Sequence, residues 1–255
     1  MFGKRILILV PHPDDEVVAC AATIGRAQQV GSKLFALYLT HGCIARDVMW
    51  PWQRKNYESI VARRRGEAEA VARFLDIEPV GWCARPARNL WRQMDAVYAE
   101  IQKAIGEHDI DQIWLPAYEG GNPDHDALNA VGQRLKRNAS VLEFTEYNFF
   151  EGKAQSHMFP YPNGGERVIE LTETECKAKK AALARYRSEK SNLNYVAVTR
   201  ECFRPLADYD YTKPPYPGTL WYARFQWVPF RHPRVDFTNS LDVSKAIGEF
   251  LKSHS

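Results

Sequence analysis

Short apolar runs alternate with longer amphipathic stretches along the first half of the chain. The runs are rich in β-branched residues and predict strands, whereas the longer stretches have the period of helices. The predicted strands are 6–10, 34–39, 80–82 and 112–115, and the predicted helices are 16–30, 57–75, 90–106 and 124–137. This order is typical of an α/β fold, here a Rossmann-like three-layer sandwich with a mostly parallel sheet and helices on both faces.

The alternation weakens after about residue 140. The remaining chain predicts a strand over 141–147, a helix over 173–186 and a final helix over 241–252. We expect the proline- and aromatic-rich stretch 200–233 to form a cap over the crevice at the sheet edge. No repeat or low-complexity linker divides the chain. We therefore predict one domain over 1–255, with a Rossmann-like core over 1–140 and a C-terminal cap and helix over 141–255.

Composition limits the partners of this protein. The 34 basic and 31 acidic residues give a net charge of +3, which lacks the basic excess of nucleic-acid binders. No apolar run approaches the ~20 residues of a membrane-spanning helix. The five cysteines form no Cys-x-x-Cys pair and are expected to be reduced thiols of a cytoplasmic protein. Aromatic residues such as Trp221 and Trp227 suit a core, a contact in a homo-oligomer or a wall for sugar rings.

The first predicted strand leads directly into Pro-His-Pro-Asp-Asp-Glu, residues 11–16. A dinucleotide-binding fold would have a glycine-rich turn at this position, so the motif argues against NAD. Adjacent carboxylates near a buried strand end repel one another, and a divalent cation would offset that repulsion. An acidic cap on the following helix is the alternative that this motif alone leaves open.

A second cluster of the same kind follows the fourth predicted strand. It reads Tyr-Glu-Gly-Gly-Asn-Pro-Asp-His-Asp over residues 118–126. Since parallel strands end at a common edge, His12 and His125 are expected to face one crevice, which favours a metal site over a helix cap. One of Asp14 and Asp15 would complete a three-ligand set that suits zinc, while the other turns towards the attacking water. Spacing alone does not distinguish the two aspartates.

These motifs resemble those of the PIG-L family of zinc-dependent deacetylases. The similarity covers about residues 5–140 and includes Leu-Thr-His-Gly and Arg-Arg-Gly-Glu elements. The resemblance implies that His12, Asp15 and His125 bind Zn²⁺, or another divalent metal, and that Asp14 is the general base. It also implies a small-molecule substrate, an amino sugar with an N-acetyl group, such as an N-acetylglucosaminide.

Further site residues follow from the same resemblance. Arg64 and His41 become candidates for substrate binding, and a solvent-facing arginine is the alternative for Arg64. We expect Glu16 and Asp124, each next in sequence to a ligand, to support the ligands from behind.

One position departs from the family pattern. Most relatives have His-Pro-Asp-His, whereas this chain has Asn122 in place of the first histidine. An amide can donate a hydrogen bond to an oxyanion but cannot deliver a proton. Asp14 would then act first as base and then as acid, or Tyr118 or His41 would contribute. Two alternatives to an acetyl hydrolase stay open, namely hydrolysis of a larger amide conjugate and a sugar-binding relative without turnover.

Overall fold

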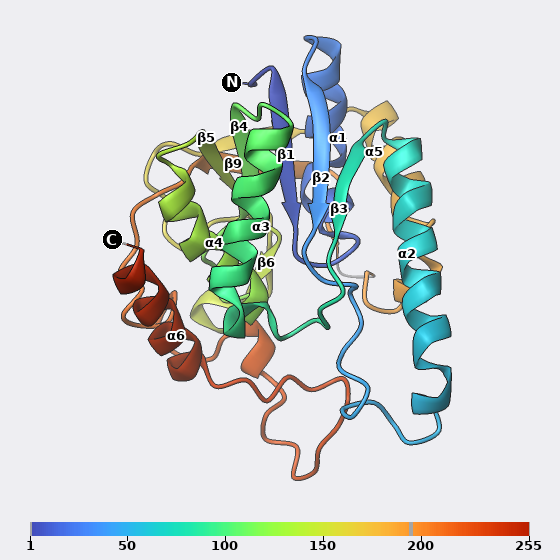
Figure 1. The fold of residues 1–255 in the computed structure, drawn as a ribbon, viewed down its shortest axis with the longest axis vertical. Helices are drawn as coiled ribbons and strands as arrows, with labels where there is room; N and C mark the ends of the chain where they lie inside the picture. The colour runs from blue at the N-terminus through green and yellow to red at the C-terminus, as the bar shows by residue number, and fades with distance from the viewer. Residues whose placement is uncertain (1, 194–195, 255) are drawn as a thin grey trace.

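The computed structural model describes residues 2–193 and 196–254 (Figure 1). Within these ranges a seven-stranded sheet has the order β3-β2-β1-β4-β5-β9-β8. Its strands are β1 (Arg5–Val10), β2 (Lys33–Tyr38), β3 (Glu78–Trp82), β4 (Gln112–Pro116), β5 (Ser140–Phe144), β8 (Arg167–Glu170) and β9 (Arg200–Pro205). The first five are parallel, and β9 and β8 add an antiparallel edge. The α/β fold predicted from the sequence is confirmed.

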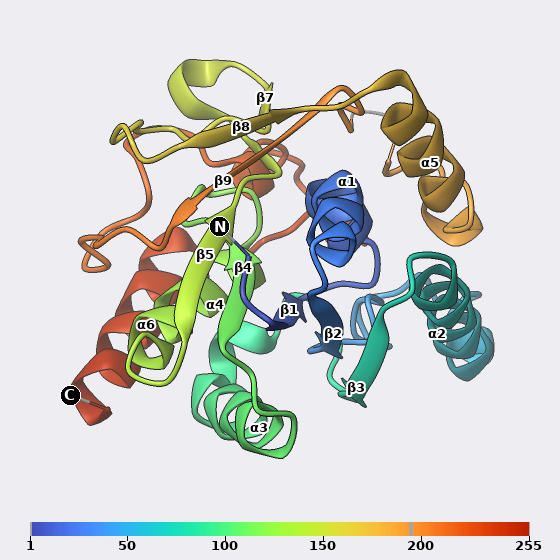
Figure 2. The same ribbon diagram turned by 90° about the horizontal axis from the view of Figure 1, so that it is seen from above.

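Helices cover both faces of the sheet (Figure 2). One face carries α1 (Asp15–Gln29), α2 (Tyr57–Phe74) and α5 (Glu173–Leu183), and the other carries α3 (Met94–Glu107), α4 (Pro123–Leu135) and α6 (Ser240–Ser253). Along β1, Leu7 and Leu9 enter the core under α3, α4 and α6, whereas Ile6, Ile8 and Val10 enter the core under α1 and α2. A strand buried on both faces has to be apolar throughout, which explains the continuous run in the sequence. No described helix is long and apolar enough to cross a membrane.

The helix predicted over 90–106 is two elements. A 3-10 turn at Leu90–Arg92 comes first, and α3 begins only at Met94 because Gln93 leaves the helical region with φ −133° and ψ 29°. The Leu90 backbone N–H donates to Asp124 Oδ1 at 2.9 Å, which fixes the turn against the start of α4. The single periodic stretch in the sequence conceals this break.

The second half of the chain differs more from the prediction. The strand predicted over 141–147 ends at Phe144, and Tyr147 instead begins β6 (Tyr147–Asn148), which pairs with β7 (Gln155–Ser156). The stretch predicted as a cap begins as β9 inside the sheet. Its later part does lie over the loop after β4, where the Trp221 backbone N–H donates to Gly120 O at 2.9 Å.

The hydrophobic pattern does not predict β9, because charged residues occupy buried positions of this strand. Arg204 is ion-paired with Glu143 of β5 at 2.7 Å. Glu201 receives Lys179 Nζ of α5 at 2.9 Å and the backbone N–H groups of Ala22 and Thr23 of α1 at 3.0 and 2.9 Å. The Lys179 and Glu201 side chains are fully buried. Glu201 therefore joins β9, α1 and α5 through one carboxylate.

Candidate metal centre

The site begins where β1 and β4 end. These strands are parallel neighbours, with Ile8 opposite Trp114, so the loops that follow them leave the same edge of the sheet. The first loop supplies His12 and leads into Asp15, the first residue of α1. The second loop leads into α4, whose first turn contains His125. Sheet order thus brings together residues that are more than 100 positions apart.

Three ligand atoms converge at this edge. His12 Nδ1 lies 3.2 Å from His125 Nε2 and 3.4 Å from Asp15 Oδ2, and His125 Nε2 lies 3.2 Å from Asp15 Oδ2. All three side chains are buried. The atoms form an almost equilateral triangle of two imidazole nitrogens and one carboxylate oxygen.

This triangle fits a divalent cation. Metal–ligand bonds of about 2.0–2.2 Å in a tetrahedral arrangement place the ligand atoms roughly 3.3–3.6 Å apart. The observed separations of 3.2–3.4 Å come close to that spacing. A mixed nitrogen and oxygen donor set suits zinc, and three protein ligands leave one position for substrate or water. Of the two aspartates, Asp15 is the one in the triangle.

Asp124 supports His12 from behind. Its Oδ2 lies 3.1 Å from His12 Nε2, so the other ring nitrogen, Nδ1, faces the triangle. The buried Asp124 carboxylate also accepts the Arg88 and Leu90 backbone N–H groups at 2.6 and 2.9 Å. A carboxylate in this position fixes the ring orientation of a metal-binding histidine. Burial lowers the pKa of His12, but the charges of Asp15 and Asp124 outweigh it and raise the pKa to about 10.

Asp14 is next in sequence to the ligand Asp15 and forms an ion pair with Arg64. Its Oδ2 accepts a hydrogen bond from Arg64 Nη2 at 2.9 Å, and its backbone has φ 139°, in the region that favours glycine. Burial raises the pKa of the Asp14 carboxyl to about 7, although Arg64 opposes the shift. Glu16 Oε2 accepts the Asp14 backbone N–H at 3.1 Å, while its other oxygen accepts the Tyr186 hydroxyl. Glu16 therefore holds the loop that presents Asp14.

Arg64 is not a solvent-facing arginine. It is 2% exposed, and its guanidinium also pairs with Glu189 at 3.2 Å. In this structure Arg64 contacts Asp14 rather than an open surface. The solvent-facing alternative is therefore wrong, and the expected substrate contact is a prediction that the structure leaves untested.

The remaining predicted residues lie in different places. His41 Nε2 is 3.1 Å from the Tyr57 hydroxyl, and burial lowers the pKa of His41. The Tyr118 hydroxyl donates to Lys213 O at 2.7 Å, and its ring packs in the hydrophobic core. The Tyr118 hydroxyl is thus engaged by a backbone carbonyl, and its part in proton delivery stays a prediction.

Asn122 is the N-cap of α4. Its Oδ1 accepts the Asp124 backbone N–H at 2.9 Å, and Pro123 occupies the first helical position. Both features are typical of helix starts. The side-chain oxygen is therefore used structurally, and only the amide NH₂ is left to face a reacting carbonyl.

Asn122→Ala should lower the free energy of unfolding by about 1 kcal/mol, because alanine cannot accept the Asp124 N–H. Asn122→Ser keeps an acceptor and should retain most of that stability. Urea denaturation of both variants measures the difference. An alanine variant as stable as the parent would show that the cap contributes nothing. If Asn122→Ser is as stable as the parent but catalyses its reaction more slowly, the amide NH₂ of Asn122 takes part in catalysis.

One residue of the site was missed by the sequence interpretation. Glu146 follows β5, is 1% exposed, and has two carboxylate oxygens without a hydrogen-bond partner among the described residues. Burial and the charge of Asp15 raise the pKa of Glu146 well above its usual value. The prediction placed Glu146 inside a strand over 141–147. The strand in fact ends at Phe144, which puts Glu146 in the loop at the same sheet edge as His12.

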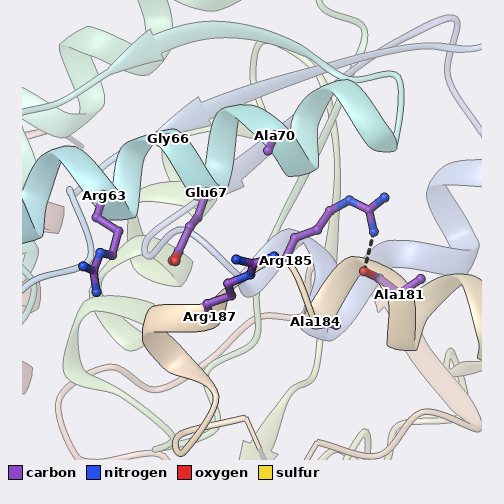
Figure 3. Close-up of a pocket in the computed structure, with 8 residues that line it drawn as sticks. All are labelled: Arg63, Gly66, Glu67, Ala70, Ala181, Ala184, Arg185 and Arg187. Atoms are coloured by element: carbon purple, nitrogen blue, oxygen red, sulfur yellow. Dashed lines mark hydrogen bonds between the residues drawn. The ribbon is translucent and has the colours of Figure 1, made fainter.

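A cavity of about 930 Å³ lies elsewhere, between α2 and the end of α5 (Figure 3). It is lined by Arg63, Gly66, Glu67, Ala70, Ala181, Ala184, Arg185 and Arg187. None of the triangle residues lines it. Ser188, next to this cavity, donates through its backbone N–H to Glu67 at 3.1 Å. The ligand triangle is therefore located by its chemistry and not by the size of a cavity.

Comparison with known families gives one match over half of the chain. The family described as PIG-L, GlcNAc-PI de-N-acetylase, matches residues 7–136. This range includes the whole ligand triangle and Asp14. A curated relative from Kineococcus radiotolerans, 1D-myo-inositol 2-acetamido-2-deoxy-alpha-D-glucopyranoside deacetylase, is 25% identical over 114 residues. The alignment covers 45% of this chain but only 32% of that relative, so the chain matches about a third of its length.

Solved structures show the same fold. A deacetylase from the biosynthesis pathway of teicoplanin has a TM-score of 0.61 at 20% identity, covering 79% of this chain and 97% of that one. The N,N'-diacetylchitobiose deacetylase from Pyrococcus horikoshii has a TM-score of 0.54 at 19% identity, covering 79% and 83%. At these identities the likeness is one of fold.

Proposed function

The chain belongs to the PIG-L family of GlcNAc-PI de-N-acetylases, and on that basis we propose that it is a zinc-dependent hydrolase that removes the acetyl group from an amino sugar. The ligand triangle of His12, Asp15 and His125 is the observation that carries this proposal, because its donor atoms and spacing fit zinc. The similar proteins from Kineococcus radiotolerans and Pyrococcus horikoshii are deacetylases, which agrees with this proposal.

Each residue has a role in amide hydrolysis. A bound zinc ion would supply a Lewis acid that polarises the acetyl carbonyl and lowers the pKa of water towards neutrality. Asp14 lies outside the ligand triangle and takes the proton of the attacking water as general base. Arg64 holds the Asp14 carboxyl in place and opposes the rise in its pKa that burial causes, and Asp124 keeps His12 oriented. Since Asn122 cannot deliver a proton, Asp14 returns its proton to the leaving amine.

Metal binding and acetate release test the proposal together. Protein stripped with a chelator should bind one Zn²⁺ per chain and release acetate from a panel of N-acetylglucosaminides only when loaded. At zinc 100-fold above its Kd, the free energy of unfolding should rise by about 2.7 kcal/mol, measured by thermal denaturation. His125→Ala should show neither effect. Zinc binding without acetate release from any member would contradict the activity, and an unchanged melting curve would contradict the metal site.

A further inference from the structure

Two loops at the edge of the sheet expose an unusual number of aromatic rings. They are residues 46–55, between β2 and α2, and residues 224–237, before α6, and we call them the rim loops. Trp52 is 64% exposed, Trp227 76% and Phe230 57%. Both loops project at the bottom of Figure 1, on the side towards which β1 and β2 run. Large exposed aromatic patches mark interaction sites on soluble domains.

The rim loops form one structure. Trp50 stacks on Trp52 with ring centres 5.1 Å apart and meets His232 edge-on at 5.2 Å. His232 is in turn 6.0 Å from the Phe230 ring. Within the first loop, Arg54 donates to Met49 O and Asp47 O at 3.0 and 2.7 Å. The exposed Trp52 and Phe230 rings therefore lie on one connected surface, and Trp227 belongs to the same loop as Phe230.

This surface is tied to the metal centre through Arg88. The Arg88 guanidinium donates to Pro233 O and Val235 O, each at 3.1 Å. Its backbone N–H donates to Asp124, the carboxylate that holds His12. One residue thus connects the second rim loop to the support of a metal ligand, and the rim loops border the site.

The charge of the rim loops restricts what they can bind. Five basic residues are exposed there, namely Arg46, Arg54, Lys55, Arg231 and Arg234. None forms an ion pair with an acidic side chain in the part of the chain that the structure describes. Of the two acidic residues in the rim loops, Asp236 is buried against Arg88 at 3.4 Å, which leaves Asp47 exposed. The surface is aromatic and strongly basic.

We propose that the rim loops dock on the surface of an anionic lipid bilayer. Tryptophan and phenylalanine rings partition into the headgroup region, and clustered arginine and lysine side chains bind anionic headgroups. A neutral apolar group on a soluble substrate would account for the rings but not for the five cations. Docking in this way brings the border of the metal centre to the bilayer. The docking does not depend on the proposed function.

Sedimentation with vesicles tests the docking. The protein should sediment with vesicles of equal parts phosphatidylcholine and phosphatidylglycerol at low salt, less in high salt, and little with phosphatidylcholine alone. Arg231→Gln with Arg234→Gln should weaken this partitioning about 25-fold, from about fivefold for each basic residue. Trp227→Ser with Phe230→Ser should weaken it at least tenfold. Phe74→Ser, which alters a half-exposed ring at the other end of α2, should have no effect.

Melting curves establish that each variant is folded. Absence of sedimentation with anionic vesicles at low salt overturns the proposal, and so does equal sedimentation of the rim variants and the parent. A raised KM of the Trp227/Phe230 variant for a soluble apolar glucosaminide, without vesicle binding by the parent, would assign the rings to the substrate instead. Vesicle binding needs no turnover, so its outcome is independent of acetate release.

Discussion

Asp14→Asn should lower acetate release from an N-acetylglucosaminide by roughly 10²–10⁴-fold, the usual contribution of a general base. Asparagine has the same shape, and its side-chain oxygen can still accept the hydrogen bond from Arg64 that the structure shows at 2.9 Å. It cannot take a proton from water. Because Asp14 lies outside the ligand triangle, zinc content should not change.

Initial rates at saturating substrate, together with metal analysis of the same samples, measure this effect. Glu69→Gln is a suitable control, since it makes the same change from carboxyl to amide on α2, at a residue that pairs with the exposed Arg65 at 2.9 Å. Its rate should stay within about twofold of the parent, as expected for a group without a part in proton transfer. A rate for Asp14→Asn close to the parent would remove Asp14 as the base, and loss of zinc would make it a ligand instead.

Lys179→Met should lower the free energy of unfolding by about 3–5 kcal/mol, the cost of leaving one member of a buried ion pair uncompensated. Lys179 Nζ lies 2.9 Å from Glu201, and both side chains are fully buried. Glu201 also accepts two backbone N–H groups of α1, so the substitution should weaken the packing of α1, α5 and β9 against one another.

Urea denaturation measures this loss, and a second variant separates charge from packing. Lys179→Met with Glu201→Gln removes the buried charge while keeping an acceptor for α1, and should recover part of the stability. Lys136→Met breaks the exposed pair with Asp208 and should stay close to the parent. A loss below about 1 kcal/mol for Lys179→Met would show that the buried ion pair between Lys179 and Glu201 contributes little to stability.

Prediction from the sequence succeeds where burial is simple. Strand β1 is apolar on both faces, so its pattern alone identifies it. Strand β9 has Glu201 and Arg204 at buried positions, and their partners Lys179 and Glu143 lie on other elements. Such compensation depends on tertiary contacts that no local pattern contains.

The same distinction applies to the site. His12 and His125 were predicted to meet because each follows a strand of one parallel sheet, and they do meet. The target of Arg64 could not be predicted, since Asp14 is 50 residues away and nothing in the helix pattern marks an inward-facing arginine. Glu146 was missed through an error of a few residues in the end of a strand.

The backbone of Asp14 places two demands on one position. A φ of 139° suits glycine, whereas proton transfer requires a carboxyl group. A residue held in such a conformation costs on the order of 1–3 kcal/mol. Glycine would relieve that strain, but it would also leave the buried Arg64 guanidinium without its Asp14 partner, and it could not accept a proton. Attempts to make this protein more heat-resistant should leave the loop as it is and improve surfaces far from it.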